Sequence, residues 1–228
     1  MCGRYYRRSD KQRIAEAFRV DLPTSFDILS SYNVTPQSFQ PVVRLNRDTG
    51  EREVAQLRWG LVPFWSRDGK IDYSTINAKA KTVATSPTFR EALKRRRCLV
   101  PADGFYEWHK LDEKNRQAYA IALTDCSRLA FAGLWERWVD KATNDLLETY
   151  TIITTEPNEL TAPIHNRMPV ILAPKDYERW MAPTDPAQLP LDLPRPFDAE
   201  KMMTWKVGEA VGSVKNNVPE LLNQAQTA

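Results

Sequence analysis

The period of apolar and polar positions changes along the first hundred residues. Ser9-Asp-Lys-Gln12 has the form of a capping box, and the apolar residues that follow it recur at helical spacing. Residues 41–46 and 54–59 have the composition of strands, and the polar segment 46–50 between them is typical of a hairpin turn. Residues 87–96 carry a proline at their start and basic side chains toward their end, which favours a helix.

From residue 98 onward the pattern predicts strands joined by short polar turns. These turns are too short to hold a crossover helix, so we expect antiparallel meanders. A short helix is predicted at 174–181, and the proline-rich segment 183–196 is predicted to be a surface connection. The predicted strands are 104–110, 117–124, 129–138, 147–155 and 168–172. The predicted fold is a single α+β domain over residues 1–228, with a mostly antiparallel, barrel-like sheet core and peripheral helices.

Composition narrows the class of protein. The chain has 228 residues, 42% of them hydrophobic, which is enough for a substantial core. No segment approaches the ~20 apolar residues of a membrane span, and no apolar signal segment is expected. Cys2, Cys98 and Cys126 lack the spacing of a metal site and fit a reducing compartment. Phosphate-binding and dinucleotide-binding motifs are absent from the sequence, so we expect no cofactor or metal. We also expect a cytoplasmic monomer without a membrane partner.

Charge is more informative locally than globally. The formal net charge of +3 is too small to indicate a nucleic-acid partner. Basic residues are concentrated in two stretches, residues 4–13 and residues 79–97. Such clusters suit a phosphate backbone, but the run 94–97 also fits an ordinary solvated helix face. Both interpretations remain open from the sequence.

Cys2 is a candidate nucleophile because of its position. A small residue after the initiator methionine usually permits removal of Met1, which would leave an α-amine and a thiol on neighbouring carbons of Cys2. The ordinary pKa of an α-amine is about 8, against about 10.4 for lysine, so more of the α-amine is neutral and nucleophilic at neutral pH. The thiol is a second nucleophile. A 1,2-aminothiol can condense with an aldehyde through a Schiff base and close to a five-membered thiazolidine.

Four further side chains could assist such chemistry. His165 lies in a turn-rich segment, where an imidazole suits acid–base work. Strand alternation places Glu107 on the same face as Phe105, where burial would raise its pKa and suit proton transfer; an exposed edge-strand position is the alternative. Asn77 could orient a hydroxyl or phosphate, and Trp65 is the best candidate for stacking on an exposed base.

Seven sequence blocks, taken in order, carry a family resemblance. They are Met1-Cys-Gly-Arg4, Tyr32-Asn-Val-Thr-Pro36, Arg58-Trp-Gly-Leu61, Ile76-Asn-Ala-Lys79, Gly104-Phe-Tyr-Glu-Trp108, His165-Asn-Arg-Met-Pro169 and Val207-Gly208. This order resembles the SRAP family, the SOS-response-associated peptidases, over nearly the whole chain. Any one block would be weak evidence, whereas seven in order are specific.

The resemblance implies a protein that forms a covalent crosslink with abasic sites, preferentially in single-stranded DNA, in association with the chromosome. It implies that Cys2 is the nucleophile after removal of Met1 and that Asn77 positions the abasic sugar. It further implies that Glu107 handles protons during condensation. His165 corresponds to a histidine thought to promote opening of the deoxyribose ring and to take part in strand cleavage or crosslink reversal.

The resemblance also implies a DNA-binding surface. The positions that contact the DNA backbone in the family correspond to Arg4, Asn33, Lys79, Thr154 and Arg167. Pro36 and Trp65 lie where relatives insert between bases or stack on them. Two positions depart from the family pattern. Lys79 often has an arginine counterpart, so bidentate phosphate geometry is lost, and Pro87 stands where some relatives carry a basic residue.

Two other functions remain compatible with the sequence. A peptidase would use Cys2 as its hydrolytic nucleophile and His165 as the base. A non-catalytic reader of single-stranded or modified DNA would use the basic stretches and Trp65. The free α-amine distinguishes them, because aldehyde capture requires it and the other two functions do not.

Overall fold

The computed structural model describes residues 2–22, 27–46, 48–70 and 73–225. The strands are β1 (Tyr5–Arg7), β2 (Ser31–Val34), β3 (Phe39–Leu45), β4 (Arg52–Trp59), β5 (Asn77–Lys79), β6 (Arg97–Ala102), β7 (Gly104–Lys110), β8 (Arg116–Leu123), β9 (Leu129–Val139), β10 (Leu146–Thr155), β11 (Met168–Pro169), β12 (Ile171–Leu172) and β13 (Met202–Lys206). The α-helices are α1 (Lys11–Phe18), α2 (Arg90–Arg95) and α3 (Tyr177–Met181). Short 3-10 segments, including Tyr73–Ile76 and Glu209–Gly212, lie between them.

Five strands close into a barrel. Strand β10 pairs with β4, β4 with β3, β3 with β6, β6 with β9, and β9 returns to β10. Of these pairings only β4–β10 is parallel. Strand β5 also pairs with β10 in the parallel sense, just beyond the β4 contact. The barrel therefore brings β5 beside the end of β4, although 17 residues separate these strands in the sequence.

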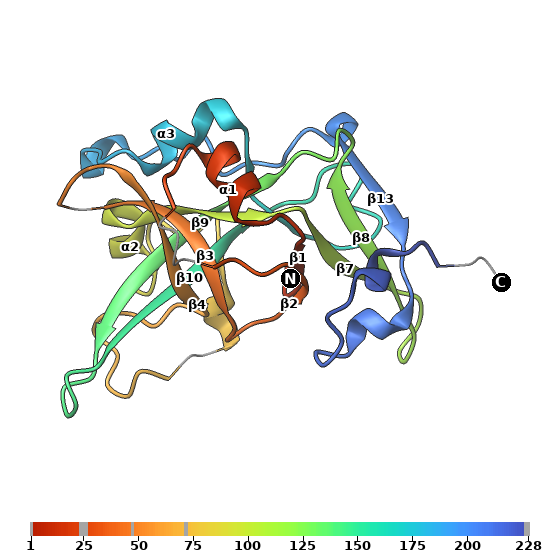
Figure 1. The fold of residues 1–228 in the computed structure, drawn as a ribbon, viewed down its shortest axis with the longest axis horizontal. Helices are drawn as coiled ribbons and strands as arrows, with labels where there is room; N and C mark the ends of the chain where they lie inside the picture. Colours follow the sequence, from red (N-terminus) through yellow and green to blue (C-terminus); the bar gives the residue numbers. More distant parts are fainter. Residues whose placement is uncertain (1, 23–26, 47, 71–72, 226–228) are drawn as a thin grey trace.

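A second antiparallel sheet packs against this barrel, with strand order β13-β8-β7-β1-β2. Figure 1 shows β7, β8 and β13 on the opposite side of the molecule from α2. Strand β1 is interior to this sheet, because it pairs with β2 on one edge and with β7 on the other. The amino-terminal segment is thus held between two strands rather than left at a sheet edge.

Alternation along the barrel strands divides their side chains between two layers. Val42, Trp59 and Tyr150 belong to an inner cluster that also includes Tyr5 and Phe105 of the second sheet. Neighbouring positions such as Val43, Leu99 and Ile153 form an outer layer together with residues of α1, α2 and α3. A third cluster joins the second sheet to the C-terminal segment. The period of two in strands explains this division.

The α+β, mostly antiparallel and barrel-like architecture is confirmed, and the predicted long strands fall within a few residues of those observed. The helix cap is corrected. Asp10 accepts from the backbone N–H of Arg13 at the start of α1, whereas Ser9 is buried and donates to Asp103. The predicted strand 168–172 is two short strands, because Pro169 pairs with β10 and Ile171 pairs with β9.

Two further local predictions need correction. The helix predicted at 87–96 is limited to α2 at Arg90–Arg95, and the helix predicted at 174–181 consists of a 3-10 turn followed by α3. The hairpin turn 46–50 joins β3 and β4 as predicted, although Arg47 lies outside the described residues. The segment 183–196 contains one 3-10 turn, at Pro186–Gln188, and Pro190 and Leu193 within it are buried.

The basic run 94–97 is not a uniform solvated face. Arg97 is 4% exposed and donates to the carbonyl oxygens of Leu93 and Trp180 at 2.6 Å, which ties α2 to α3. Arg96 pairs with the buried Glu136 at 2.6 Å. Half of this run therefore stabilises the fold. None of the helices in the described ranges has the length and apolar character needed to cross a membrane.

Candidate functional site

Cys2 lies in the inner cluster, where its side chain is fully buried. The chain that follows it is fixed by backbone hydrogen bonds, since Arg4 accepts at its carbonyl from the N–H of Tyr106 at 2.9 Å. Strand β1 then continues between β2 and β7. Burial raises the pKa of the Cys2 thiol well above its ordinary value, and the nearby charge of Glu107 raises it further. The thiol is therefore protonated at neutral pH.

Asn77 holds the backbone of Cys2. It is the first residue of β5, where it pairs with Ile152 of β10. Its side-chain Nδ2 donates to the carbonyl oxygen of Cys2 at 2.9 Å. Its Oδ1 is buried and accepts no hydrogen bond from the described residues. Asn77 thus fixes the nucleophile with one end of its amide and retains an acceptor at the other.

Glu107 is a buried carboxyl group in the middle of the second sheet. Strand β7 pairs with β1 and β8, so the edge-strand alternative is wrong, and Glu107 is 3% exposed. Its pKa is raised to about 7, chiefly by burial, against the opposing effect of positive charge at the amino terminus and on Arg167. At neutral pH the group is divided between its acid and base forms, which suits proton transfer in either direction.

His165 lies on the loop that precedes β11. Its backbone N–H donates to the carbonyl of Thr161 at 2.9 Å, and its Nδ1 lies 3.1 Å from both the backbone nitrogen and the carbonyl oxygen of Arg167. Nδ1 can accept from this N–H or donate to this carbonyl, according to which ring nitrogen of the neutral imidazole carries the proton. Partial burial lowers the pKa of His165 below its ordinary value, helped by positive charge at the amino terminus and on Arg167. The imidazole is therefore mainly neutral at neutral pH.

The predicted DNA contacts occupy different environments. Lys79 and Trp65 are exposed, and Arg4, Pro36 and Arg167 are partly exposed. Asn33 and Thr154 are buried, at 5% and 1% exposure. Thr154 lies opposite Lys79 in the β5–β10 pairing, which places one exposed cation beside the end of the barrel. Contact between any of these side chains and DNA stays a prediction.

Sequence reasoning missed the groups that hold Arg4. The Arg4 guanidinium donates to Asn33 Oδ1 at 2.7 Å and to the carbonyl oxygen of Val211 at 2.9 Å, and it lies over the Trp108 ring. Val211 is about two hundred residues away in the sequence and contributes a backbone atom. No side-chain motif could have indicated it.

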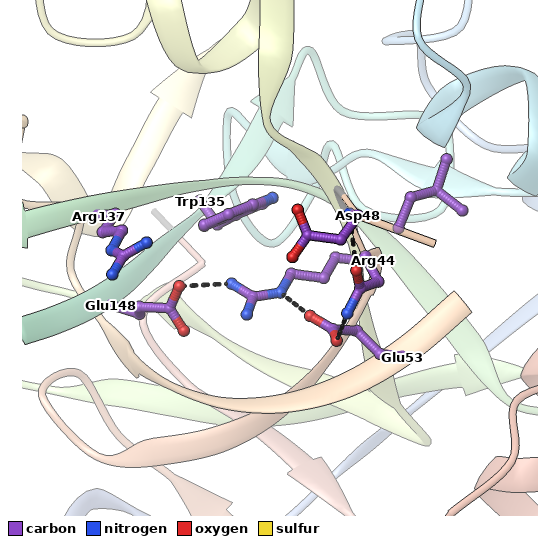
Figure 2. A pocket seen from close by; sticks show the side chains of 8 residues that line it. Arg44, Asp48, Glu53, Trp135, Arg137 and Glu148 are labelled. Carbon is purple, nitrogen blue, oxygen red and sulfur yellow. Dashed lines mark hydrogen bonds and ion pairs between the residues drawn. The ribbon is translucent and has the colours of Figure 1, made fainter. Parts of the chain in front are cut away.

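A separate pocket lies on the barrel surface near the β3–β4 turn. Figure 2 shows Arg44 between two carboxylates, with Glu53 at 2.7 Å and Glu148 at 2.8 Å. The Arg44 guanidinium also stacks over Trp135 at 4.1 Å. None of its lining residues belongs to the predicted site. Among the described residues, no group of three or more His, Cys, Asp or Glu side chains is placed to hold a metal ion.

The raised pKa of Glu107 predicts a measurable dependence of stability on pH. The ordinary pKa of the carboxyl is 4.5 and the folded value is about 7, so the folded state binds this proton more tightly. The stabilisation is complete below pH 4.5 and is lost as pH rises through about 7, a loss of ~3 kcal/mol. Between pH 4.5 and pH 8, the free energy of unfolding measured with urea should therefore fall by ~3 kcal/mol less in Glu107→Gln than in wild type. The control variant Glu113→Gln changes an exposed carboxyl, and its free energy of unfolding should change with pH as in wild type. An equal change in Glu107→Gln and wild type would contradict the raised pKa of Glu107.

Comparison with known proteins identifies the family of the chain. A family model described as SOS response associated peptidase (SRAP) matches residues 1–214. The abasic site processing protein YoqW of Bacillus subtilis is 44% identical over 226 residues, covering 97% of this chain and 99% of that protein. The abasic site processing protein HMCES of Gallus gallus is 33% identical, covering 84% of this chain and 65% of that protein. A crystal structure of a Bacteroides thetaiotaomicron protein superposes with a TM-score of 0.85 at 31% identity, covering 99% of this chain and 100% of that one. The chain therefore belongs to the SRAP family.

Proposed function

We propose that this protein processes abasic sites in DNA by capturing the ring-opened sugar on Cys2 as a thiazolidine. The relatives with the same family architecture are named as abasic site processing proteins. The observation that carries the proposal is the hydrogen bond from Asn77 Nδ2 to the Cys2 carbonyl oxygen. It joins two of the sequence-predicted residues directly, although 75 positions separate them.

The chemistry begins with an aldehyde. An abasic deoxyribose is mostly a closed hemiacetal, so an acid–base group near C1′ raises the supply of the open form. His165 suits this step, because its neutral imidazole has an acceptor nitrogen and a donor nitrogen. The acceptor Oδ1 of Asn77 is available to a sugar hydroxyl.

The α-amine of Cys2 then attacks C1′ and forms a carbinolamine. Glu107 donates a proton to the departing hydroxyl, which leaves as water, and its carboxylate then takes the proton of the nitrogen, which gives the neutral Schiff base. The thiol sulfur next adds to C1′, and its proton passes to the imine nitrogen, closing the ring with the loss of one water overall. Closure is intramolecular and gains a high effective molarity.

The raised pKa of the thiol supports this order of events. A protonated thiol is a poor first nucleophile, but it brings the proton that the imine nitrogen needs at ring closure. A cysteine peptidase needs the opposite, a thiolate activated by its base. The buried thiol beside Glu107 therefore favours aldehyde capture over peptide hydrolysis.

The proposal is tested with a single-stranded oligonucleotide that contains one abasic site. We expect a heat-resistant adduct on a denaturing gel with protein whose Met1 has been removed, as verified by intact mass. The same protein carrying an amino-terminal extension should give none, and an oligonucleotide without the abasic site should give none. A double-stranded abasic oligonucleotide, run in parallel, measures the preference for single strands.

Each alternative has its own outcome. An adduct that forms equally with the extended amino terminus would exclude the amine and contradict the thiazolidine mechanism. Binding to the oligonucleotide without any adduct would identify a non-catalytic reader. Cleavage of a peptide panel, lost in Cys2→Ala, would identify a peptidase.

A further inference from the structure

The C-terminal residues 209–217, here called the strap, cross the amino-terminal part of the second sheet. Val211 in the strap is fully buried in the cluster that includes Tyr6 and Tyr106. Further along, Asn217 Oδ1 accepts from the backbone N–H of Tyr32 at 2.6 Å. The strap is thus anchored by an apolar contact at one end and by a hydrogen bond at the other. Figure 1 shows this dark-blue C-terminal part of the chain on the same side of the molecule as β7 and β8.

Asn33 joins the strap to strand β2. Its Nδ2 lies within hydrogen-bond distance of three strap carbonyl oxygens, those of Asn216 at 2.7 Å, Ser213 at 3.0 Å and Val211 at 3.3 Å. The side chain is 5% exposed. All of the donor capacity of this amide is therefore directed at backbone atoms of the strap.

The opposite end of the same amide faces Arg4. Asn33 Oδ1 accepts from Arg4 Nη1 at 2.7 Å, and the Val211 carbonyl accepts from the same nitrogen at 2.9 Å. Trp108 lies beneath the guanidinium, 5.7 Å from its central carbon to the ring centroid. Two acceptors and one aromatic face thus fix the orientation of a cation that is two residues from Cys2.

We propose that Asn33 and the strap are positioning elements that aim the Arg4 guanidinium at the DNA backbone. The inference rests on the proposed function, in which Arg4 contacts a phosphate beside the captured sugar. Asn33, which the family resemblance placed among the DNA-backbone contacts, then acts through Arg4 and does not touch DNA itself. Its burial and its bonds to the strap account for this, since its amide already has protein partners at both ends.

The advantage of such a device is the lower entropy cost of binding. An arginine side chain has several rotatable bonds, and its ordering at an interface costs free energy. The contacts with Asn33, Val211 and Trp108 order the guanidinium before DNA arrives. The C-terminal end of the family match therefore contributes to an amino-terminal site.

A double-mutant cycle tests the inference on binding of a single-stranded oligonucleotide that carries a tetrahydrofuran analogue of the abasic site, which has no aldehyde and cannot form the adduct. The variants are Arg4→Gln, Asn33→Leu and the pair together, with Kd measured over a series of salt concentrations. We expect Arg4→Gln to weaken binding about 10-fold and to reduce the salt slope by ~0.7, the value for one lost contact with single-stranded phosphate. Asn33→Leu should reproduce both effects, and the double variant should be no weaker than Arg4→Gln alone.

Two further variants keep the test decisive. Asn46→Leu removes an amide with comparable hydrogen bonds in the β3–β4 turn and should leave Kd unchanged. If Asn33→Leu fails to fold, Asn217→Ala loosens the exposed end of the strap and should shift Kd and the salt slope in the same direction.

The outcomes test the role of Asn33 and the phosphate contact of Arg4 separately, and adduct formation by Cys2 is measured independently of both. Lower stability of Asn33→Leu with an unchanged Kd and salt slope would overturn the inference and leave a purely structural asparagine. Full additivity in the double variant would also overturn it, because Asn33 would then contact DNA independently. An unchanged salt slope in Arg4→Gln would remove the proposed phosphate contact of Arg4, and the inference would fail with it.

Discussion

Cys2→Ala is expected to abolish the heat-resistant adduct with abasic DNA while leaving an adduct that borohydride can trap. Alanine retains the small size that permits removal of Met1, so the variant still presents an α-amine. That amine can form the Schiff base, but no second nucleophile is present to close the ring. Without intramolecular closure the imine hydrolyses, and we expect the persistent adduct to fall by at least ~100-fold, well within the effective molarities of such closures.

The measurement is a pair of denaturing gels, one after heating and one after reduction with borohydride. Cys126→Ala is the matched control, because this thiol is free and exposed and lies outside the proposed site. The control should behave as wild type on both gels. A heat-resistant adduct of undiminished yield in Cys2→Ala would show that sulfur plays no part in the product.

Glu107→Gln is expected to slow crosslink formation about 100-fold in single-turnover experiments, within the range for loss of a general acid. Glutamine preserves the shape of the side chain but cannot transfer the proton that dehydration of the carbinolamine requires. The pKa of about 7 makes a second prediction. In wild type the supply of acid decreases as pH rises above about 7 while the neutral amine increases, so the rate should pass through a maximum; in the variant it should only rise.

Glu113→Gln serves again as the control and should retain both the rate and the bell-shaped profile. DNA affinity of Glu107→Gln, measured before reaction, should stay close to wild type. A rate within threefold of wild type, or a bell-shaped profile that survives in Glu107→Gln, would assign the proton transfer to another group.

The local sequence pattern predicted the bounds of the strands better than it predicted which strands pair with each other. Strand β7 was predicted at its observed bounds, because alternation between Phe105 and its neighbours is visible in the sequence. The assignment of β8 and β9 to different sheets was not predictable, because a turn of five residues looks the same whether it joins paired strands or crosses between layers. The parallel closure of the barrel by β4 and β10 depends on contacts between residues about ninety positions apart.

The candidate site shows the same limit. The family resemblance related Asn77, Glu107 and His165 to the chemistry of Cys2, but the hydrogen bond from Asn77 Nδ2 to the Cys2 carbonyl was not predicted. The burial of Glu107 depends on β1 pairing along β7, which no local pattern encodes. Arg97 looked like part of a basic surface, yet it is buried because its guanidinium reaches carbonyl groups in two helices. Charge type is visible in a sequence, whereas the presence of nearby acceptors is a property of the fold.

The interior position of β1 has a consequence for biosynthesis. Residue 2 is synthesised among the first, but strand β1 after it pairs with residues 31–34 and with residues 104–105. The carbonyl oxygen of Cys2 accepts a hydrogen bond from Asn77. Almost half of the chain must be synthesised before the amino terminus can dock. Until then the segment after residue 2 lacks these partners, whereas the folded chain holds it on both sides. We therefore expect methionine removal to be fastest on the ribosome-bound chain, before these pairings hold the amino terminus.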